Sequence, residues 1–377
     1  MEEVVAEEYY GIWVEAEGKV RPFDSRKNFD EYLKLIQEHS FTDIFCQIYR
    51  GGRSWFPSKI ADPTPYNKAK ADGVDPLRET IDLAHSRGQK VHAWVNTLRI
   101  AHNDKAPVLD MLGEDIVLQD NQGNSILQYP GHDKAPGKLA GRYRVGTPGI
   151  WLDASHKRLR QYMIEVVREI VANYPDIDGI HLDMVRSPLP MLQRKGRNRL
   201  RFGHGKHAVS EFERLTGSTE TSGKVWEDWR RSQTSLLVMQ IKEMLEREAP
   251  GVKLTAAVVG KHKRAIDWAY QDWPTWVESG VLDYVVPMAY TKKTKSVNEM
   301  AKFAMTKRGN QKVLMGLGAW LLLDKPEKMI RQIESVRREQ VDGFVLFSYA
   351  NLQNPKGRKM LRALESHFVV EPEAVEN

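Results

Sequence analysis

The stretch that decides the fold is DGIHLDMVRSP, residues 178–188. Apolar side chains occupy every second position of its first half, which is the period of a β-strand. The stretch ends with a carboxylate, Asp183, followed by Arg186 and a proline. Charged side chains are rare inside strands unless they are paired or functional. This stretch therefore predicts a strand with a paired or functional carboxylate at its end. The position of the strand in the fold decides between these two roles.

Outward from this stretch, strand-like segments alternate with helical segments or loops along most of the chain. Strands are predicted over residues 9–15, 42–49, 90–96, 178–188, 253–259, 282–290, 312–317 and 342–349. Helices are predicted to begin near residues 28 and 76 and to cover residues 156–173, 225–248, 273–279, 300–308, 326–339 and 355–367. Asp153 or Ser155 is the predicted cap of the helix over residues 156–173. Eight alternating β and α units predict an α/β fold of the (β/α)8 TIM-barrel type.

The length of the chain fits one barrel with long loops. A typical barrel needs about 250 residues, and this chain has 377, so the excess is expected in extended loops after strands two, three and four. An open doubly wound sheet would carry a glycine-rich turn after its first strand, but residues 15–18 read EAEG. We expect one barrel domain over residues 9–368, with flexible termini at residues 1–8 and 369–377.

Composition narrows the class of protein. The formal net charge is +6 and the sequence pI is about 9.1, which allows an anionic partner without requiring one. Cys46 is the only cysteine, so an intrachain disulfide and a cysteine-rich zinc site are excluded. No apolar run reaches the length of a membrane-spanning helix.

A barrel places its active site at the C-terminal ends of the strands. Polar and aromatic residues predicted at or just beyond these ends are Glu15, Arg50, Trp94, Asn96, His181, Asp183, Arg186, Asp267, Asp272, Tyr290, Trp320 and Tyr349. Aromatic rings stack on the apolar faces of sugars, and carboxylates protonate the leaving oxygen or stabilise the oxocarbenium-like carbon. The set therefore predicts a glycan site that uses water and needs no cofactor or metal.

Asp183 is the first candidate for catalysis, as nucleophile or acid, and the alternative is a structural carboxylate held by Arg186. The predicted seventh strand carries no glutamate, so the common pattern of two glutamates is absent. Glu15, Asp267 and Asp272 remain as partners, although Asp272 could instead cap the helix that follows it. The separation of the two carboxyls would distinguish a retaining from an inverting mechanism, and both stay open.

The predicted substrate-binding residues each have a second interpretation. Arg186 either orients Asp183 or binds an anionic sugar group. His181 either donates to substrate or is a satisfied histidine inside the barrel, and Asn96 either bonds a sugar hydroxyl or closes its strand. The aromatic residues either line sugar subsites or belong to the core; they are Trp94, Tyr290, Trp320 and Tyr349.

A basic loop follows the fourth predicted strand, and no acidic residue occurs between Asp183 and Glu211. Its cations are Arg194, Lys195, Arg197, Arg199, Arg201 and Lys206. The loop is either a solvated charge run or an electropositive rim that favours sugars with carboxylates. Aromatic residues are sparse in it, which argues against nucleic acid. His204 and His207 lack a nearby strong ligand partner, which argues against a metal site.

The chain resembles the glycosyl hydrolase-like 10 family of bacterial barrel proteins. The matching pieces are residues 11–14 (GIWV), 75–77, 90–96 (KVHAWVN), 151–155 (WLDAS), 178–188, 272–273, 280–290 and 343–349, and they span residues 9–350 in order. The resemblance implies a TIM-barrel glycoside hydrolase acting on a polysaccharide or bacterial cell-wall glycan. The chain departs from the family pattern at Met184 and Val185, where an acidic or aromatic residue is expected, and at Met288, where a glutamine is expected.

These observations favour a glycoside hydrolase with a carboxylate at the end of strand four. The alternatives are a carbohydrate-binding barrel without catalysis, or a polyanion-binding protein that uses the loop at residues 194–206. The expected partner is an oligo- or polysaccharide, anionic if the basic loop faces the site. The family implies a periplasmic or extracellular location if a leader was removed from the acidic start of the chain, and a cytoplasmic location is expected otherwise.

Overall fold

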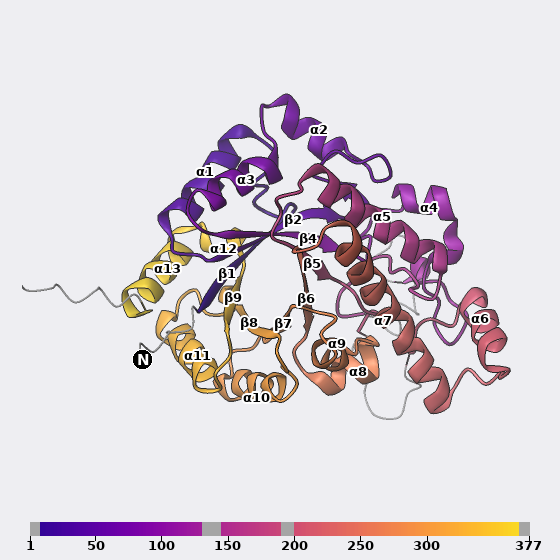
Figure 1. Ribbon diagram of the computed structural model, residues 1–377. Coiled ribbons are helices and arrows are strands. Elements are labelled where there is room, and N and C mark those ends of the chain that lie inside the picture. The colour runs from indigo at the N-terminus through magenta and orange to yellow at the C-terminus, as the bar shows by residue number, and fades with distance from the viewer. Residues whose placement is uncertain (1–7, 130–144, 190–199, 369–377) are drawn as a thin grey trace, which may run out of the picture.

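The computed structural model describes residues 8–129, 145–189 and 200–368. Eight parallel strands form a closed barrel in these residues, and β1 closes it by pairing with both β2 and β9 (Figure 1). The barrel strands are β1 (Tyr9–Val14), β2 (Asp43–Arg50), β4 (Lys90–Asn96), β5 (Gly179–Asp183), β6 (Lys253–Val259), β7 (Tyr284–Met288), β8 (Lys312–Gly318) and β9 (Gly343–Phe347). The predicted TIM-barrel fold is confirmed.

Helices form a ring outside the strands (Figure 1). They are α1 (Arg26–Glu38), α3 (Pro76–His85), α5 (Lys157–Asn173), α7 (Gly223–Glu248), α8 (His262–Ala269), α9 (Trp273–Glu278), α10 (Thr294–Met305), α11 (Pro326–Arg338), α12 (Tyr349–Leu352) and α13 (Pro355–Phe368). Within the described ranges, none of the helices combines the length and apolarity needed to cross a membrane.

The long connections lie after β2, β4 and β5, as the sequence predicts. They contain short elements that the sequence pattern does not reveal. These are β3 (Arg53–Ser54), α2 (Thr64–Ala71), α4 (Pro107–Leu112), the 3-10 helices η1 (Glu114–Ile116) and η2 (Ile126–Gln128), and α6 (Lys206–Thr216). A further 3-10 helix, η4 (Ala319–Leu321), follows β8.

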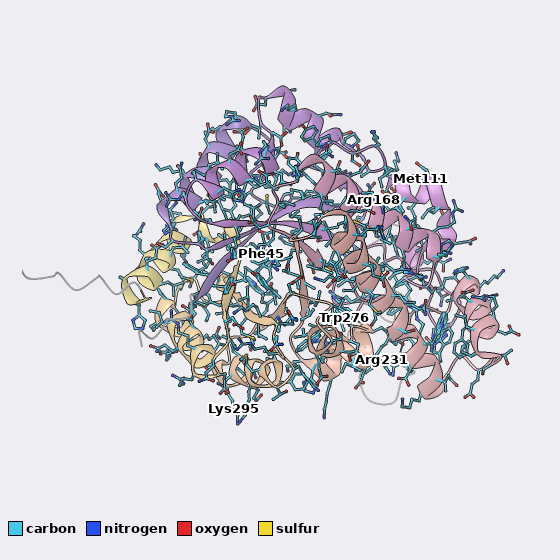
Figure 2. All side chains as sticks on the ribbon, in the orientation of Figure 1. Phe45, Met111, Arg168, Arg231, Trp276 and Lys295 are labelled. Atoms are coloured by element: carbon cyan, nitrogen blue, oxygen red, sulfur yellow. The ribbon has the colours of Figure 1, made fainter. Side chains whose placement is uncertain are left out.

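Two apolar layers hold the barrel together. Side chains of one parity along the strands pack against the helices, as Ile180 and Leu182 of β5 do. Side chains of the other parity fill the interior, where Trp13 and Phe45 pack with their rings 6.0 Å apart, and Figure 2 shows Phe45 inside the ring of strands. Gly316 makes room for this filling, because a Cβ there would lie 2.8 Å from Cη2 of Trp13.

The strand β5 is shorter than the predicted strand over residues 178–188. The carboxylate of Asp178 accepts a hydrogen bond from the backbone N–H of Val91 at 2.8 Å, and β5 begins at the next residue. At the other end, Met184 adopts a φ of 55°, a left-handed conformation that ends an extended strand. Met184, Val185 and Arg186 therefore lie in the loop that crosses the barrel end.

The predicted cap of α5 is wrong. The residue before the helix is His156, and its side chain makes no capping hydrogen bond. Asp153 instead forms a buried ion pair with Arg230 at 2.9 Å and accepts a hydrogen bond from the backbone N–H of Ser155. A buried carboxylate costs several kcal/mol unless a charge partner compensates it, which explains why Asp153 turns toward α7.

Replacing Gly343 by alanine tests barrel closure. A Cβ at this position would lie 2.1 Å from the carbonyl oxygen of Tyr9, on the strand that closes the barrel. We expect Gly343→Ala to lower the free energy of unfolding by about 1–3 kcal/mol or more, measured by urea denaturation. Gly146→Ala is the control, because its Cβ would meet nothing closer than 3.6 Å. Equal stability of the two variants would contradict the closure geometry.

Candidate active site

A cavity of about 170 Å³ lies at the C-terminal end of the barrel strands. It brings together six of the residues predicted for the site, which come from five separate strand ends. They are Glu15, Arg50, Trp94, Asn96, Asp183 and Tyr290. Residues that are far apart in the chain thus meet in one place, as expected for the active end of a barrel.

Asp183 is the last residue of β5 and stands beside Asn96 of β4 in the strand register. Its side chain is buried, with 5% of the residue exposed. Burial raises the pKa of this carboxyl, while the backbone N–H of Met184 and the charges of Arg186 and Arg99 act in the opposite direction. The N–H of Met184 donates to Oδ1 at 2.7 Å. Asp183 therefore keeps a proton to higher pH than an exposed aspartate does.

Glu15 is the second carboxyl in the cavity and directly follows β1. Burial raises its pKa, and a hydrogen bond from Ser348, the backbone N–H groups of Glu15 and Ala350, and the charge of Arg50 oppose the rise. Its buried Oε2 atom has no hydrogen-bond partner among the described residues. Glu15 thus keeps one buried acceptor that the described protein groups leave open.

Tyr290 lines the cavity together with the two carboxyls. It lies just beyond β7 and is partly buried, and desolvation together with the nearby charges of Asp183 and Glu15 raises the pKa of its hydroxyl well above the usual value. Its ring packs against Phe347 with a centroid separation of 5.4 Å. Asp183, Glu15 and Tyr290 therefore share one cavity.

Aromatic rings form the floor of this space. Trp13 and Trp94 both line the cavity, and the ring of Phe347 lies 5.9 Å from the first and 6.5 Å from the second. Such rings offer flat apolar surfaces on which a sugar can stack. Trp94 and Tyr290 thus both line the cavity, and their role in binding a sugar stays a prediction.

Gln47 and Arg99 line the cavity but were not predicted. The Nε2 group of Gln47 donates to Oδ1 of Asn96 at 3.3 Å, and its Oε1 atom accepts from Arg50 at 3.4 Å. Strand alternation could have found Gln47, since it shares the parity of the interior residue Phe45. Arg99 has no such signal, because it lies beyond β4 in a loop. Burial lowers its pKa to about 10.

His181 lies beneath the cavity rather than in it. Its Nε2 atom accepts a hydrogen bond from the indole N–H of Trp13 at 3.0 Å, and its Nδ1 atom pairs with Oγ1 of Thr255 at 2.8 Å. Burial and the charge of His92 lower its pKa well below the usual value, so the ring is neutral. Both ring nitrogens have hydrogen-bond partners within the protein. This fits the second interpretation from the sequence, a histidine inside the barrel whose hydrogen bonds are satisfied by the protein.

Asp272, Asp267, Trp320 and Tyr349 are not brought into the cavity. Asp272 precedes α9, and its side chain makes no capping hydrogen bond, while Asp267 is exposed on α8. Trp320 is 46% exposed on η4. Tyr349 is buried against Tyr32, with ring centroids 5.5 Å apart. Glu15 is therefore the candidate partner that the fold places beside Asp183.

The basic loop is only partly described. Arg194, Lys195, Arg197 and Arg199 lie outside the described residues. Arg201 stacks on Trp268, with its guanidinium carbon 4.8 Å from the ring centre, and Lys206 is exposed at the start of α6.

His204 and His207 are each packed against another ring. His204 lies against Trp226 with ring centroids 5.1 Å apart, and His207 lies 4.3 Å from His156. In the described part of the chain, no cluster of three or more His, Cys, Asp or Glu side chains could hold a metal ion.

A second and larger cavity, of about 610 Å³, adjoins the first. Met184, Met288 and Tyr290 line both cavities and form the boundary between them. Met184 and Met288 are two of the positions where the sequence departs from the family pattern. Arg186 lines the larger cavity. The two departures therefore shape the passage from the carboxyl pair into the neighbouring space.

The closed parallel barrel, with a cavity at the C-terminal ends of its strands, defines the class of protein as a TIM barrel. The sequence profile of the glycosyl hydrolase-like 10 family matches residues 8–316. The chain therefore belongs to this family, as its sequence motifs imply.

Two curated relatives are similar over most of the chain. Glycosyl hydrolase DigH of Escherichia coli (strain K12) is 24% identical, with 89% of this chain and 78% of that protein covered. Glycosyl hydrolase YngK of Bacillus subtilis (strain 168) is also 24% identical, with 87% and 65% covered.

Solved structures show the same fold. The catalytic domain of β-amylase from Paenibacillus polymyxa superposes with a TM-score of 0.62 at 12% identity, covering 96% of this chain and 97% of that one. The C-terminal domain of a chitinase-like protein from Desulfitobacterium hafniense DCB-2 gives a TM-score of 0.54 at 10% identity, covering 96% and 99%.

The raised pKa of Asp183 predicts how stability depends on pH. A carboxyl whose pKa is higher in the folded than in the unfolded state stabilises the fold below the unfolded pKa, and this stabilisation is lost as the pH rises through the folded pKa. We therefore expect Asp183→Asn to be more stable than the wild type near pH 8, with the difference shrinking toward about pH 4. Thermal unfolding of both proteins across this range measures it. A difference that grows toward acidic pH would contradict the assignment.

Proposed function

We propose that the chain hydrolyses O-glycosidic bonds of a polysaccharide or bacterial cell-wall glycan with Asp183 and Glu15 as its carboxyl pair. The observation that carries the proposal is that both carboxyls line one aromatic-floored cavity, and that burial raises the pKa of each. A glycosidase needs one carboxyl that holds a proton for the leaving oxygen and one that acts on the sugar carbon or on water.

The hydrogen bonds suggest how the roles divide. Three donors support the ionised form of Glu15, namely Ser348 and the backbone N–H groups of Glu15 and Ala350, and Arg50 adds a positive charge. The ionised form of Asp183 is supported by the backbone donor of Met184 and by the side chain of Trp94, which are fewer donors than at Glu15, and its side chain is more deeply buried. We assign the general acid to Asp183, and the nucleophile or base to Glu15 through its free Oε2 atom.

The substrate class rests on the family and on the ring geometry. DigH and YngK are both named glycosyl hydrolases, and the family is likewise named glycosyl hydrolase-like. Trp13, Trp94 and Tyr290 supply stacking surfaces, and Asn96 and Gln47 supply amides that can bind sugar hydroxyls. A neutral or charged pyranose chain fits this combination, with water as the second substrate.

Removing either carboxyl tests the proposal. We expect Asp183→Asn and Glu15→Gln each to lower kcat by about 10²–10⁴-fold, measured as reducing ends released from a panel of chitin oligosaccharides and peptidoglycan glycan strands. Asp272→Asn is the matched control, since Asp272 does not line the cavity, and it should retain activity. Full activity of Asp183→Asn, with the control also active, would exclude Asp183 as the acid.

The same panel separates an enzyme from a carbohydrate-binding barrel. An enzyme releases reducing ends in proportion to its concentration and to time. A barrel that has lost catalysis would bind these glycans, measured by isothermal titration calorimetry, with no release on long incubation. Binding without release would overturn the proposed hydrolysis.

A further inference from the structure

The charged side chains that line the larger cavity, beside the carboxyl pair, are all positive. Four cations line it, Arg186, Lys261, Arg264 and Lys293, and its described lining contains no aspartate or glutamate. None of these four cations forms an ion pair within the described ranges, where other surface arginines and lysines form many. Among the described residues, Asp183, outside this cavity, is the one carboxyl whose charge acts on Arg186. Cations that converge around a cavity repel one another, and a bound anion would relieve this repulsion.

Arg186 is the buried cation in the lining of this cavity. Only 4% of the residue is exposed, and its guanidinium lies 4.8 Å above the ring of Trp151. One of its nitrogens donates to the carbonyl of Ser187 at 3.1 Å, but its buried Nε atom has no hydrogen-bond partner among the described residues. Burial lowers its pKa to about 10; the charge of Asp183 opposes this shift, and the charges of Arg99 and Arg264 add to it. A buried guanidinium with a free donor is costly unless a ligand completes it.

We propose that this cavity is a subsite for a sugar residue that carries a carboxylate, held by Arg186 with Lys261, Arg264 and Lys293. The inference rests on the proposed glycosidase function and names its substrate class as acidic glycans. Arginine matches a carboxylate through paired N–H donors, and lysines add positive charge without fixed geometry.

The position of the cavity suits this role. Its volume of about 610 Å³ falls within the range of about 300–1,000 Å³ that is usual for small-molecule sites. It meets the catalytic cavity at Met184, Met288 and Tyr290. A glycan chain with one sugar at the carboxyl pair would therefore place a neighbouring sugar among the cations. The two methionines give this passage an apolar wall against which a sugar ring can pack.

The test compares carboxylate-bearing oligosaccharides with their neutral methylamide derivatives. One pair of probes contains N-acetylmuramic acid, and a second pair contains a uronic acid, so that the position of the carboxylate on the sugar is also tested. We expect the wild type to show a lower KM for the free acid than for the amide of at least one pair. The KM for the acid should rise with ionic strength, and the KM for the amide should not.

A triple variant isolates the cations. We expect Lys261→Gln/Arg264→Gln/Lys293→Gln to raise KM for the free acid by about tenfold or more, while kcat and the KM for the amide change little. These three residues are exposed, so their replacement should leave the fold intact. Lys295→Gln is the matched control, because Lys295 lies nearby on α10, is exposed, and points away from the barrel (Figure 2).

The outcomes separate this inference from the proposed function. Equal KM values for acid and amide, unchanged in the triple variant, would overturn the acidic subsite while hydrolysis stands. If neither probe is hydrolysed, calorimetry on the wild type decides the inference. Salt-sensitive binding of the acid that the triple variant loses would support the subsite even though hydrolysis fails, and equal binding of acid and amide would exclude it.

Discussion

The arrangement of the site depends on a chain of hydrogen bonds across the barrel interior. The indole of Trp13 on β1 donates to His181 on β5, which pairs in turn with Thr255 on β6. This chain joins β1 to β5, which are not neighbours in the sheet, and ties β5 to its neighbour β6. Asp183 follows His181 by two residues, so the alternation of the strand aims both to the same side. His181, which does not line the cavity, thus shares the inward face of β5 with the candidate acid.

Burial and positive charge both act on the carboxyls at the C-terminal end of the barrel. Burial raises the pKa values of Asp183 and Glu15, while the cations of the adjoining cavity limit this effect on Asp183 through Arg186. The same cations would draw an acidic glycan toward the carboxyl pair. One group of residues therefore serves both the chemistry and the proposed choice of substrate, because electrostatic effects are strong where water is excluded.

The sequence predicted the eight strands well because each has a clear apolar run with turn signals at its ends. β4 and β6 begin and end at the predicted residues. The prediction was weaker in the connections, where α2 and α4 are too short to show a clear helical period. The amphipathic helix α6, which buries Ala208 and Phe212, was not predicted. The cap of α5 was wrong because Asp153 has a distant partner, Arg230, that local sequence does not show. The extent of β5 was overestimated because a left-handed turn at Met184 carries no sequence signal.

The sequence by itself determined the barrel, the family, and the candidacy of Asp183, since these depend on the order of strands and on which residues end them. Tertiary structure alone selected Glu15 over Asp267 and Asp272, added Gln47 and Arg99, and left Trp320 and Tyr349 outside the cavity. It also gathered Arg186 with cations from the β6 and β7 connections. The reason is physical: a closed barrel brings strand ends together in space, and the distances among them depend on register and tilt, which no local pattern encodes.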